Sequence, residues 1–274
     1  MSQQKQSNFW NTPLTSSLVK GKDVKLPEML LGYFIGPVGG LLSSGIFTSI
    51  LNTYFTDVLK LDLTFLTTLQ LVSTIFIVIA NLVVGQLIER TRVLAGKARP
   101  WILLSALTLS VASVLMFIVP FEGVLKMVWI AIAYNLYYSV AYPIYNTANS
   151  TLVAVTTRNS DQRGQLASFT NIAGQAAMGA GSMVFPILVS FALKENQALW
   201  FGAMLAVGIL TALTVFLQYK FSRERVTEEL MESGEEEQEE DKPKAASMGT
   251  QFKAVASEKW WWVVMIFYMI FQFS

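Results

Sequence analysis

The chain has 274 residues, of which 53% are hydrophobic and only 14% are charged, and its formal net charge is +1. A soluble globular domain carries about 25% charged residues, so this composition excludes an ordinary soluble protein. The absence of cysteine excludes a disulfide framework and thiol chemistry. The absence of histidine removes the commonest metal ligand, and the near-neutral charge gives no reason to expect a nucleic-acid partner.

Long uncharged stretches dominate the sequence, and each is long enough to cross a bilayer core of about 30 Å as a helix of roughly 20 residues. There are six complete ones: 29–56, 63–88, 100–121, 127–157, 164–193 and 196–219. A seventh, 260–274, opens with three tryptophans, which favour the headgroup level, and stops part-way through a span. The pattern predicts an all-α membrane protein with a six-helix bundle and a partial seventh helix. We interpret the chain as either a truncated fragment or a natural half-protein.

Loop charges predict the topology and the domains. Basic residues concentrate in the segment before the first span and in the second and fourth loops, and basic loops stay cytoplasmic. We therefore expect a multi-pass protein of the plasma membrane with a cytoplasmic N-terminus. The expected domains are a cytoplasmic segment 1–25, a six-helix bundle 26–221, a charged cytoplasmic loop 222–258, rich in glutamate, and the start of helix seven at 259–274.

Polar residues recur at helical spacing within three of the spans. The positions are Gln70, Thr74 and Asn81 in the second span, Asn135, Tyr138, Tyr142, Asn146 and Asn149 in the fourth, and Asn171 and Gln175 in the fifth. An unpaired amide in hydrocarbon costs several kcal/mol, so these faces point inward. Two interpretations stay open for each residue, a substrate cavity or interhelical contact; the long stripe in the fourth span favours the cavity. The candidate substrate-binding residues are Tyr138, Tyr142, Asn146, Asn149, Asn171 and Gln175.

Small residues mark two further features. The run Gly36-Pro37-x-Gly39-Gly40 predicts a break in the first span, which in several transporter folds accompanies a binding site. Ala173, Ala177 and Gly181 form a ridge of small side chains, which we interpret as a surface for close helix packing.

Three motifs carry a family resemblance. They are Tyr54-Phe55-Thr56-Asp57-Val58, Arg92 followed by Gly96-Lys97-Ala98-Arg99-Pro100-Trp101, and Arg163-x-Gln165-Leu166. In these motifs the chain resembles the glycoside–pentoside–hexuronide:cation symporters, the melibiose-carrier branch of the major facilitator superfamily. The resemblance implies twelve spans in two six-helix bundles, alternating access, and sugar and cation sites facing the second bundle. The implied partners are a small sugar-like solute, the lipid bilayer and the missing C-terminal bundle, with Na⁺ or H⁺ as coupling ion and no other cofactor.

The chain departs from that family at its charged positions. The family's acidic cation-binding residues correspond to Ile77 and Asn81, its acidic sugar-binding residues to Leu41 and Asn146, and its basic residue in the fifth span to Asn171. Thr74 and Asn81 remain as neutral oxygen ligands for a cation. Intramembrane ionisable groups mark ion pathways, and the six spans contain none. A coupled symporter, an uncoupled facilitator and a non-transporting sensor or scaffold are the hypotheses. No catalytic set is present, so we expect no enzyme.

The basic residues of the second and fourth loops have two interpretations. They either pair with acidic groups or helix C-termini and hold a cytoplasmic gate closed, or they only set the topology. The residues concerned are Arg92, Lys97, Arg99 and Arg163.

Overall fold

The computed structural model describes residues 12, 14–91, 93–233, 253 and 256–273. Within these ranges the chain forms helices and no strand. It divides into two compact units, Met1–Glu228 and Glu229–Ser274. The prediction of an all-α protein is therefore confirmed.

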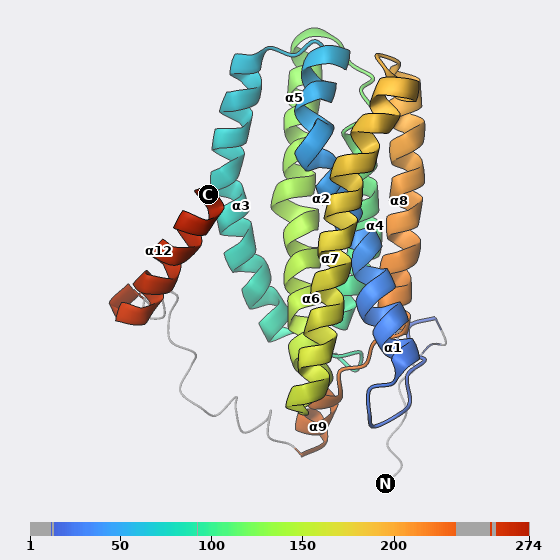
Figure 1. The fold of residues 1–274 in the computed structure, drawn as a ribbon, viewed down its shortest axis with the longest axis vertical. Coiled ribbons are helices and arrows are strands. Elements are labelled where there is room, and N and C mark those ends of the chain that lie inside the picture. The colour runs from blue at the N-terminus through green and yellow to red at the C-terminus, as the bar shows by residue number, and fades with distance from the viewer. Residues whose placement is uncertain (1–11, 13, 92, 234–252, 254–255, 274) are drawn as a thin grey trace. The chain divides into compact units, whose positions relative to one another are not determined.

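The first unit is a bundle of long helices (Figure 1). Its helices are α1 (Leu26–Leu30), α2 (Gly36–Thr53), α3 (Leu63–Arg90), α4 (Arg99–Leu115), α5 (Gly123–Asn135), α6 (Tyr142–Thr156), α7 (Ser160–Leu188) and α8 (Gln197–Lys220), and α9 (Arg225–Ser233) begins in it. Four π-helical turns extend or join them: Leu31–Ile35, Tyr54–Val58, Leu136–Ala141 and Val189–Leu193. As a result α1–α2 and α5–α6 are each one continuous rod, Leu26–Val58 and Gly123–Thr156.

Several helices begin at a side chain that caps the free backbone N–H groups of the first turn. The carboxylate of Asp62 accepts a hydrogen bond from the backbone N of Thr64 at 2.9 Å, at the start of α3. Asn159 does the same for α7 and Asn196 for α8. A charged residue stands within two positions before each cap, so the sequence marks these boundaries well.

Five helices are long and apolar enough to cross a membrane, and they correspond to five of the six predicted spans. The remaining span, predicted at 100–121, is the shorter α4, which ends at Leu115. Beyond it, the N–H groups of Phe117 and Ile118 bond to carbonyls three residues back, which tightens the chain into a turn. Pro120 has no N–H with which to continue the helix. At 17 residues α4 is about 26 Å long, at the lower limit for a span.

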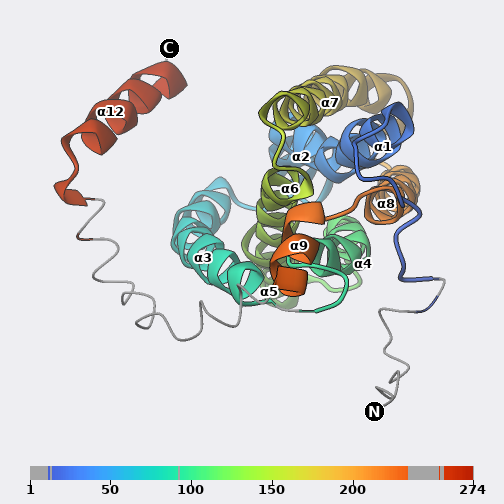
Figure 2. The same cartoon turned by 90° about the horizontal axis from the view of Figure 1, so that it is seen from below.

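Helices α2, α4 and α6 form the interior of the bundle. Helix α2 packs between α7 and α8, α4 packs on α8 and α6, and α3 packs on α6 at one side (Figure 2). The ridge of Ala173, Ala177 and Gly181 is buried in the contact between α7 and α2. A Cβ at Gly181 would lie 2.8 Å from the carbonyl oxygen of Leu42. The interpretation of this ridge as a packing surface is confirmed.

The expected break in the first span is wrong. Residues Leu26–Val58 form one continuous helical rod, and Pro37 comes just after the π-helical turn Leu31–Ile35, where the regular hydrogen-bond spacing already changes. The neighbouring glycines instead permit close approach of other helices. A Cβ at Gly36 would collide with Gln218 of α8, and one at Gly40 would collide with the ring of Tyr145 in α6.

The second unit contains the helix α12, Lys259–Phe273. It is 15 residues long, and the indole N–H of Trp262 donates to the carbonyl oxygen of Ala256 at 2.7 Å. The helix begins where the apolar stretch begins. Its assignment as the start of a seventh span, and the domain boundaries as a whole, stay predictions.

Candidate functional site

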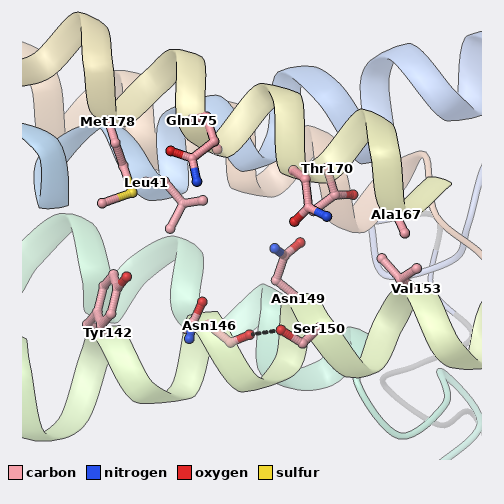
Figure 3. A pocket seen from close by; sticks show the side chains of 12 residues that line it. Leu41, Tyr142, Asn146, Asn149, Ser150, Val153, Ala167, Thr170, Gln175 and Met178 are labelled. Carbon is pink, nitrogen blue, oxygen red and sulfur yellow. Dashed lines mark hydrogen bonds between the residues drawn. The ribbon is translucent and has the colours of Figure 1, made fainter. Parts of the chain in front are cut away.

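A cavity of about 310 Å³ lies between α6 and α7, with Leu41 of α2 at its floor (Figure 3). Helices α6 and α7 both belong to the bundle but touch each other little, which leaves room for the cavity. Its lining residues are Leu41, Tyr142, Asn146, Asn149, Ser150, Val153, Ala167, Thr170, Asn171, Gly174, Gln175 and Met178. A Cβ at Gly174 would lie 2.8 Å from Leu41, so this glycine lets the floor approach α7.

The structure brings five of the six candidate substrate-binding residues to this cavity. They are Tyr142, Asn146, Asn149, Asn171 and Gln175. The sixth, Tyr138, does not line it and belongs instead to an aromatic cluster, with its ring centroid 4.5 Å from Tyr134 and 5.0 Å from Tyr137. The π-helical turn Leu136–Ala141 precedes Tyr142 and changes the helical phase, so the constant spacing assumed for the stripe does not hold there.

Sequence reasoning missed two polar residues of the cavity, Ser150 and Thr170. Ser150 follows Asn146 by one helical turn, and its hydroxyl donates to the carbonyl oxygen of Asn146 at 3.0 Å. Thr170 precedes Gly174 by one turn on the face beside Asn171. Thr170, Gly174 and Met178 are spaced four residues apart, and this helical spacing is the signal that could have identified Thr170 as a cavity residue.

Asn149 is held by a hydrogen-bond chain that reaches across the bundle. Its side-chain oxygen accepts from Nε2 of Gln218 at 2.7 Å, and Oε1 of Gln218 accepts from the hydroxyl of Tyr145 at 3.1 Å. Gln218 and Tyr145 are fully buried, so the chain stabilises the contact between α6 and α8. For Asn149 the two interpretations left open by the sequence, substrate cavity and interhelical contact, both apply, because it lines the cavity and joins two helices.

The remaining polar groups of the cavity have spare hydrogen-bonding capacity. The Thr170 hydroxyl oxygen is buried and has no hydrogen-bond partner among the described residues. Asn146, Asn171 and Gln175 are exposed. The cavity lining contains donors and acceptors but no Asp, Glu, Lys or Arg. Such a site can hydrogen-bond an uncharged polar molecule, whereas an ion would find no counter-charge on this side.

The two candidate cation ligands on α3 lie elsewhere. The Thr74 hydroxyl donates to the carbonyl oxygen of Gln70 at 2.9 Å, and the Asn81 amide donates to that of Ile77 at 2.8 Å. Both side chains are exposed and neither lines the cavity. Seven residues of helix separate them by about 10 Å, while oxygen ligands approach hard cations to about 2.4 Å. A role for Thr74 and Asn81 as cation ligands stays a prediction.

The loop before α4 encloses a buried carboxylate that sequence reasoning missed. Glu224, which follows α8, accepts hydrogen bonds from the backbone N of Lys97, Ala98 and Arg99 at 2.7, 2.8 and 2.7 Å. Gly96 turns the loop with φ at 108°, a conformation that favours glycine, and a Cβ there would collide with the carboxylate. An anion at a helix N-terminus is favourable, so Glu224 stabilises the start of α4.

Arg99 also binds within the bundle. Its guanidinium donates to the carbonyl oxygens of Ala95 at 3.2 Å and Tyr219 at 3.1 Å, and it lies 4.6 Å from the centroid of the Tyr219 ring. Tyr219 is in the last turn of α8, so Arg99 neutralises the negative end of that helix. Arg163 is exposed in the first turn of α7, and Arg92 lies outside the described residues. A gating role for these residues stays a prediction.

A second pair of buried charges ties the first helix to the segment after α8. Arg225 and Glu28 form a bidentate ion pair with N–O distances of 2.9 and 2.7 Å, and both side chains are almost fully buried. Arg225 also donates to the carbonyl oxygens of Gly21 and Asp23. We call this end of the bundle, formed by 15–28, 95–99 and 219–228, the charged end.

Long apolar helices around an uncharged polar cavity define a multi-pass membrane protein with a site suited to a polar solute. The chain belongs to the MFS/sugar transport protein family, whose model matches residues 32–274. The resemblance noted from the three motifs is thereby confirmed. Membership places the chain among transport proteins, as predicted, and not among enzymes.

Three relatives show the range of this similarity. The uncharacterized symporter YjmB of Bacillus subtilis is 30% identical over 179 residues, covering 63% of this chain and 38% of the relative. The inner membrane symporter YicJ of Escherichia coli is 28% identical over 177 residues, covering 63% and 38%. The isoprimeverose transporter of Lactiplantibacillus pentosus is 26% identical over 232 residues, covering 82% and 45%. The chain thus spans less than half the length of these relatives.

Proposed function

We propose that the complete protein is a secondary transporter of uncharged, sugar-like solutes that works by alternating access in the plasma membrane, with its N-terminus in the cytoplasm. The cavity between α6 and α7 is then the contribution of the first bundle to the substrate site, and the second bundle completes it. The single observation that carries this proposal is the set of amides and hydroxyls that line one cavity without a charged residue.

Support for the solute class comes from chemistry and from the relatives. Amide and hydroxyl groups pair with sugar hydroxyls, and the Tyr142 ring offers an apolar face at one end of the cavity. One relative is named as an isoprimeverose transporter and two are named as symporters. We therefore take glycosides and pentosides as the first substrates to test.

The coupling mechanism has two candidates. Symport is the mechanism that the names of two relatives suggest, and the coupling ion would then be Na⁺ or H⁺. An uncoupled facilitator is favoured by the uncharged cavity, because a proton-coupled site needs a titratable group and a sodium site prefers carboxylate oxygens. If coupling exists, its carboxylate belongs to the rest of the protein.

Uptake by the full-length protein tests the proposal. Cells that express it should accumulate radiolabelled methyl xyloside or isoprimeverose faster than cells with an empty vector. Asn146→Ala and Asn149→Ala should each weaken the apparent affinity about two- to tenfold, the effect of one neutral hydrogen bond. Asn135→Ala is the matched control, because this amide belongs to the same sequence stripe but does not line the cavity.

The outcomes separate the hypotheses. Normal expression with no uptake and no binding of any glycoside or pentoside would favour the sensor or scaffold. Uptake with unchanged affinity in both asparagine variants would remove the cavity from the substrate site. Dependence on an imposed Na⁺ or H⁺ gradient distinguishes the symporter from the facilitator.

A further inference from the structure

The hydrogen-bond chain behind the cavity has a direction. The Tyr145 hydroxyl donates to Oε1 of Gln218, so the other end of the Gln218 amide, Nε2, donates to Oδ1 of Asn149. An amide group has its donor and its acceptor at opposite ends. The Asn149 oxygen is therefore used behind the cavity, and its NH₂ group is left for the cavity itself.

The opposite direction would leave a buried hydrogen unpaired. If Asn149 donated to Gln218, then Nε2 of Gln218 would donate to the Tyr145 oxygen, and the Tyr145 hydroxyl hydrogen would have no acceptor. Tyr145 is fully buried and its ring lies against the backbone of Gly40, so water does not supply one. An unsatisfied buried donor costs about as much as a whole hydrogen bond, which selects the observed direction. Gln218 is also confined, because its stem lies against Gly36.

Thr170 completes the arrangement from the other side of the cavity. Its hydroxyl is buried and unpartnered among the described residues, and its side chain lines the cavity from α7, across from Asn149 on α6 (Figure 3). A buried polar atom without a partner is rare in a folded protein and requires a cause. A ligand hydroxyl supplies one, since it can accept from the Asn149 NH₂ group and donate to the Thr170 oxygen at the same time.

We propose that Asn149 and Thr170 form a subsite for one hydroxyl group of an uncharged solute, and that Gln218 and Tyr145 are positioning residues that hold the Asn149 amide with its NH₂ group toward the cavity. This inference rests on the proposed transport function for the identity of the solute. The direction of the Asn149 amide does not depend on it and can be measured without a substrate.

Side-chain amide exchange in the full-length protein tests that direction. The protein is labelled with ¹⁵N-asparagine in lipid nanodiscs, and the Asn149 signal is assigned from its loss in Asn149→Asp. We expect the Asn149 NH₂ hydrogens to exchange rapidly with water. Tyr145→Phe removes the fixed donor, so both directions become available and exchange at Asn149 slows several-fold. Slow, protected exchange in the wild type would overturn the proposal.

Tyr137→Phe is the matched control for Tyr145→Phe. It removes an equally buried tyrosine hydroxyl of the same helical rod, bonded to the Ser43 hydroxyl at 2.8 Å and not to Gln218. We expect no change in Asn149 exchange in this variant. An equal slowing in both variants would show a general loosening of the bundle and would contradict the role of Tyr145.

Thr170→Val tests the other half of the subsite with little risk to folding. Valine has nearly the same shape, and the hydroxyl that is removed makes no hydrogen bond in the structure. We expect a Tm that is unchanged or higher, together with about tenfold weaker binding of the hydroxyl-bearing solute. A clear fall in Tm with unchanged binding would show that Thr170 is structural.

Ligand binding is then compared across methyl xyloside and derivatives in which one hydroxyl is replaced by hydrogen. One deoxy derivative should bind the wild type about tenfold more weakly, and Thr170→Val should bind that derivative and the parent equally. If every deoxy derivative loses the same binding affinity in the wild type as in Thr170→Val, the subsite is absent. If the wild type binds no sugar at all, the proposed function fails while the exchange experiment still decides the direction of the amide.

Discussion

One carboxylate, that of Glu224, holds the start of α4. It is 1% exposed and accepts three backbone hydrogen bonds from the loop before α4, and a fourth from the Thr227 hydroxyl. Hydrogen bonds to a charged group are stronger than neutral ones, and a charge at a helix N-terminus adds to them. This contact explains why a loop with Gly96 at positive φ is followed directly by a buried helix start.

Glu224→Gln should lower the stability of the first bundle. The glutamine keeps the size of the side chain, but its NH₂ group faces N–H donors and removes one acceptor position. We expect a loss of about 1–3 kcal/mol in the free energy of unfolding, measured as a lower Tm in detergent micelles. Glu122→Gln, at an exposed position before α5, is the control and should leave the Tm unchanged. Equal Tm values for the two variants would contradict this account.

A glycine controls the placement of the Tyr145 ring. A Cβ at Gly40 would collide with that ring, and no flexible chain end is available to give way. Gly40→Ala should therefore displace Tyr145 from Gln218, lower the Tm and weaken binding in the cavity. Gly85→Ala, whose Cβ would meet open space on α3, is the comparison and should be neutral or slightly stabilising. Thermal unfolding and sugar binding of the two full-length variants check both expectations, and a tolerated Gly40→Ala would show that the ring can move.

For single residues, the sequence predicted the polar side chains that line the cavity better than the distant residues that form hydrogen bonds across the bundle. The cavity amides repeat at one-turn intervals, which is a local pattern: Asn146 and Asn149 in the fourth span, and Asn171 and Gln175 in the fifth. Gln218 and Glu224 act on residues 69 or more positions away, and no periodicity connects them. Thr170 looks like any helical threonine until its hydroxyl is seen to lack a partner.

The seam between α2 and α7 sets the width of the cavity. Gly181 lies against the backbone of α2, where an added Cβ would be 2.8 Å from the oxygen of Leu42 and 2.9 Å from the nitrogen of Ile46. Gly45 makes the reciprocal approach to the backbone at Met178. Close packing of small residues is a main source of helix association in membranes, because lipid offers no hydrophobic driving force.

Gly181→Ala should push α7 away from α2 and change the cavity between α6 and α7. Backbone atoms cannot rotate away as a side chain can, so overpacking here should cost about 1–3 kcal/mol. Gly179→Ala, two residues earlier and facing open space, is the matched control. Sugar binding and Tm measured together check the result: both should fall in Gly181→Ala only. If both variants behave alike, the seam is more tolerant than its geometry indicates.

The helices themselves were largely predictable, since uncharged stretches and polar caps mark where they begin and end. The exceptions share a physical cause. The π-helical turn at Leu136–Ala141 changes the phase of the polar stripe, and the tight turn after Leu115 shortens α4; both depend on backbone hydrogen bonding that composition does not encode. The glycine-rich run in α2 was misread as a break because close helix approach and a helix break call for the same residues.

Across the whole molecule, the chain spans less than half the length of two of its relatives, and in the proposed function its cavity is one side of a shared site. The charged end joins α1, α4 and α8 through the contacts of Glu28, Arg99, Glu224 and Arg225, all within the first unit. These contacts tie α1, α4 and the end of α8 together at the charged end. In the proposed alternating access, where one bundle rocks against another, they would help this end of the first bundle to move as a unit.

The uncharged cavity also limits how transport can be coupled to an ion. No Asp, Glu, Lys or Arg lines the cavity, and the chain has no histidine. The cavity therefore has no side chain of a type that titrates near neutral pH. We expect uptake by the full-length protein to vary less than about twofold between about pH 5.5 and about pH 8 through any effect of this cavity. Asn146→Asp should introduce a dependence, because the neutral acid resembles the amide while the carboxylate adds a charge.

The sign of that dependence follows from the chemistry of the new group. A carboxylic acid is neutral below its pKa and carries a negative charge above it. Uptake by Asn146→Asp should approach the wild-type rate at low pH and depart from it as the pH rises through that pKa. Initial rates of methyl xyloside uptake, measured at a series of pH values with Na⁺ and again with K⁺, check this. A steep pH or Na⁺ dependence already in the wild type would assign the coupling group to residues outside this cavity.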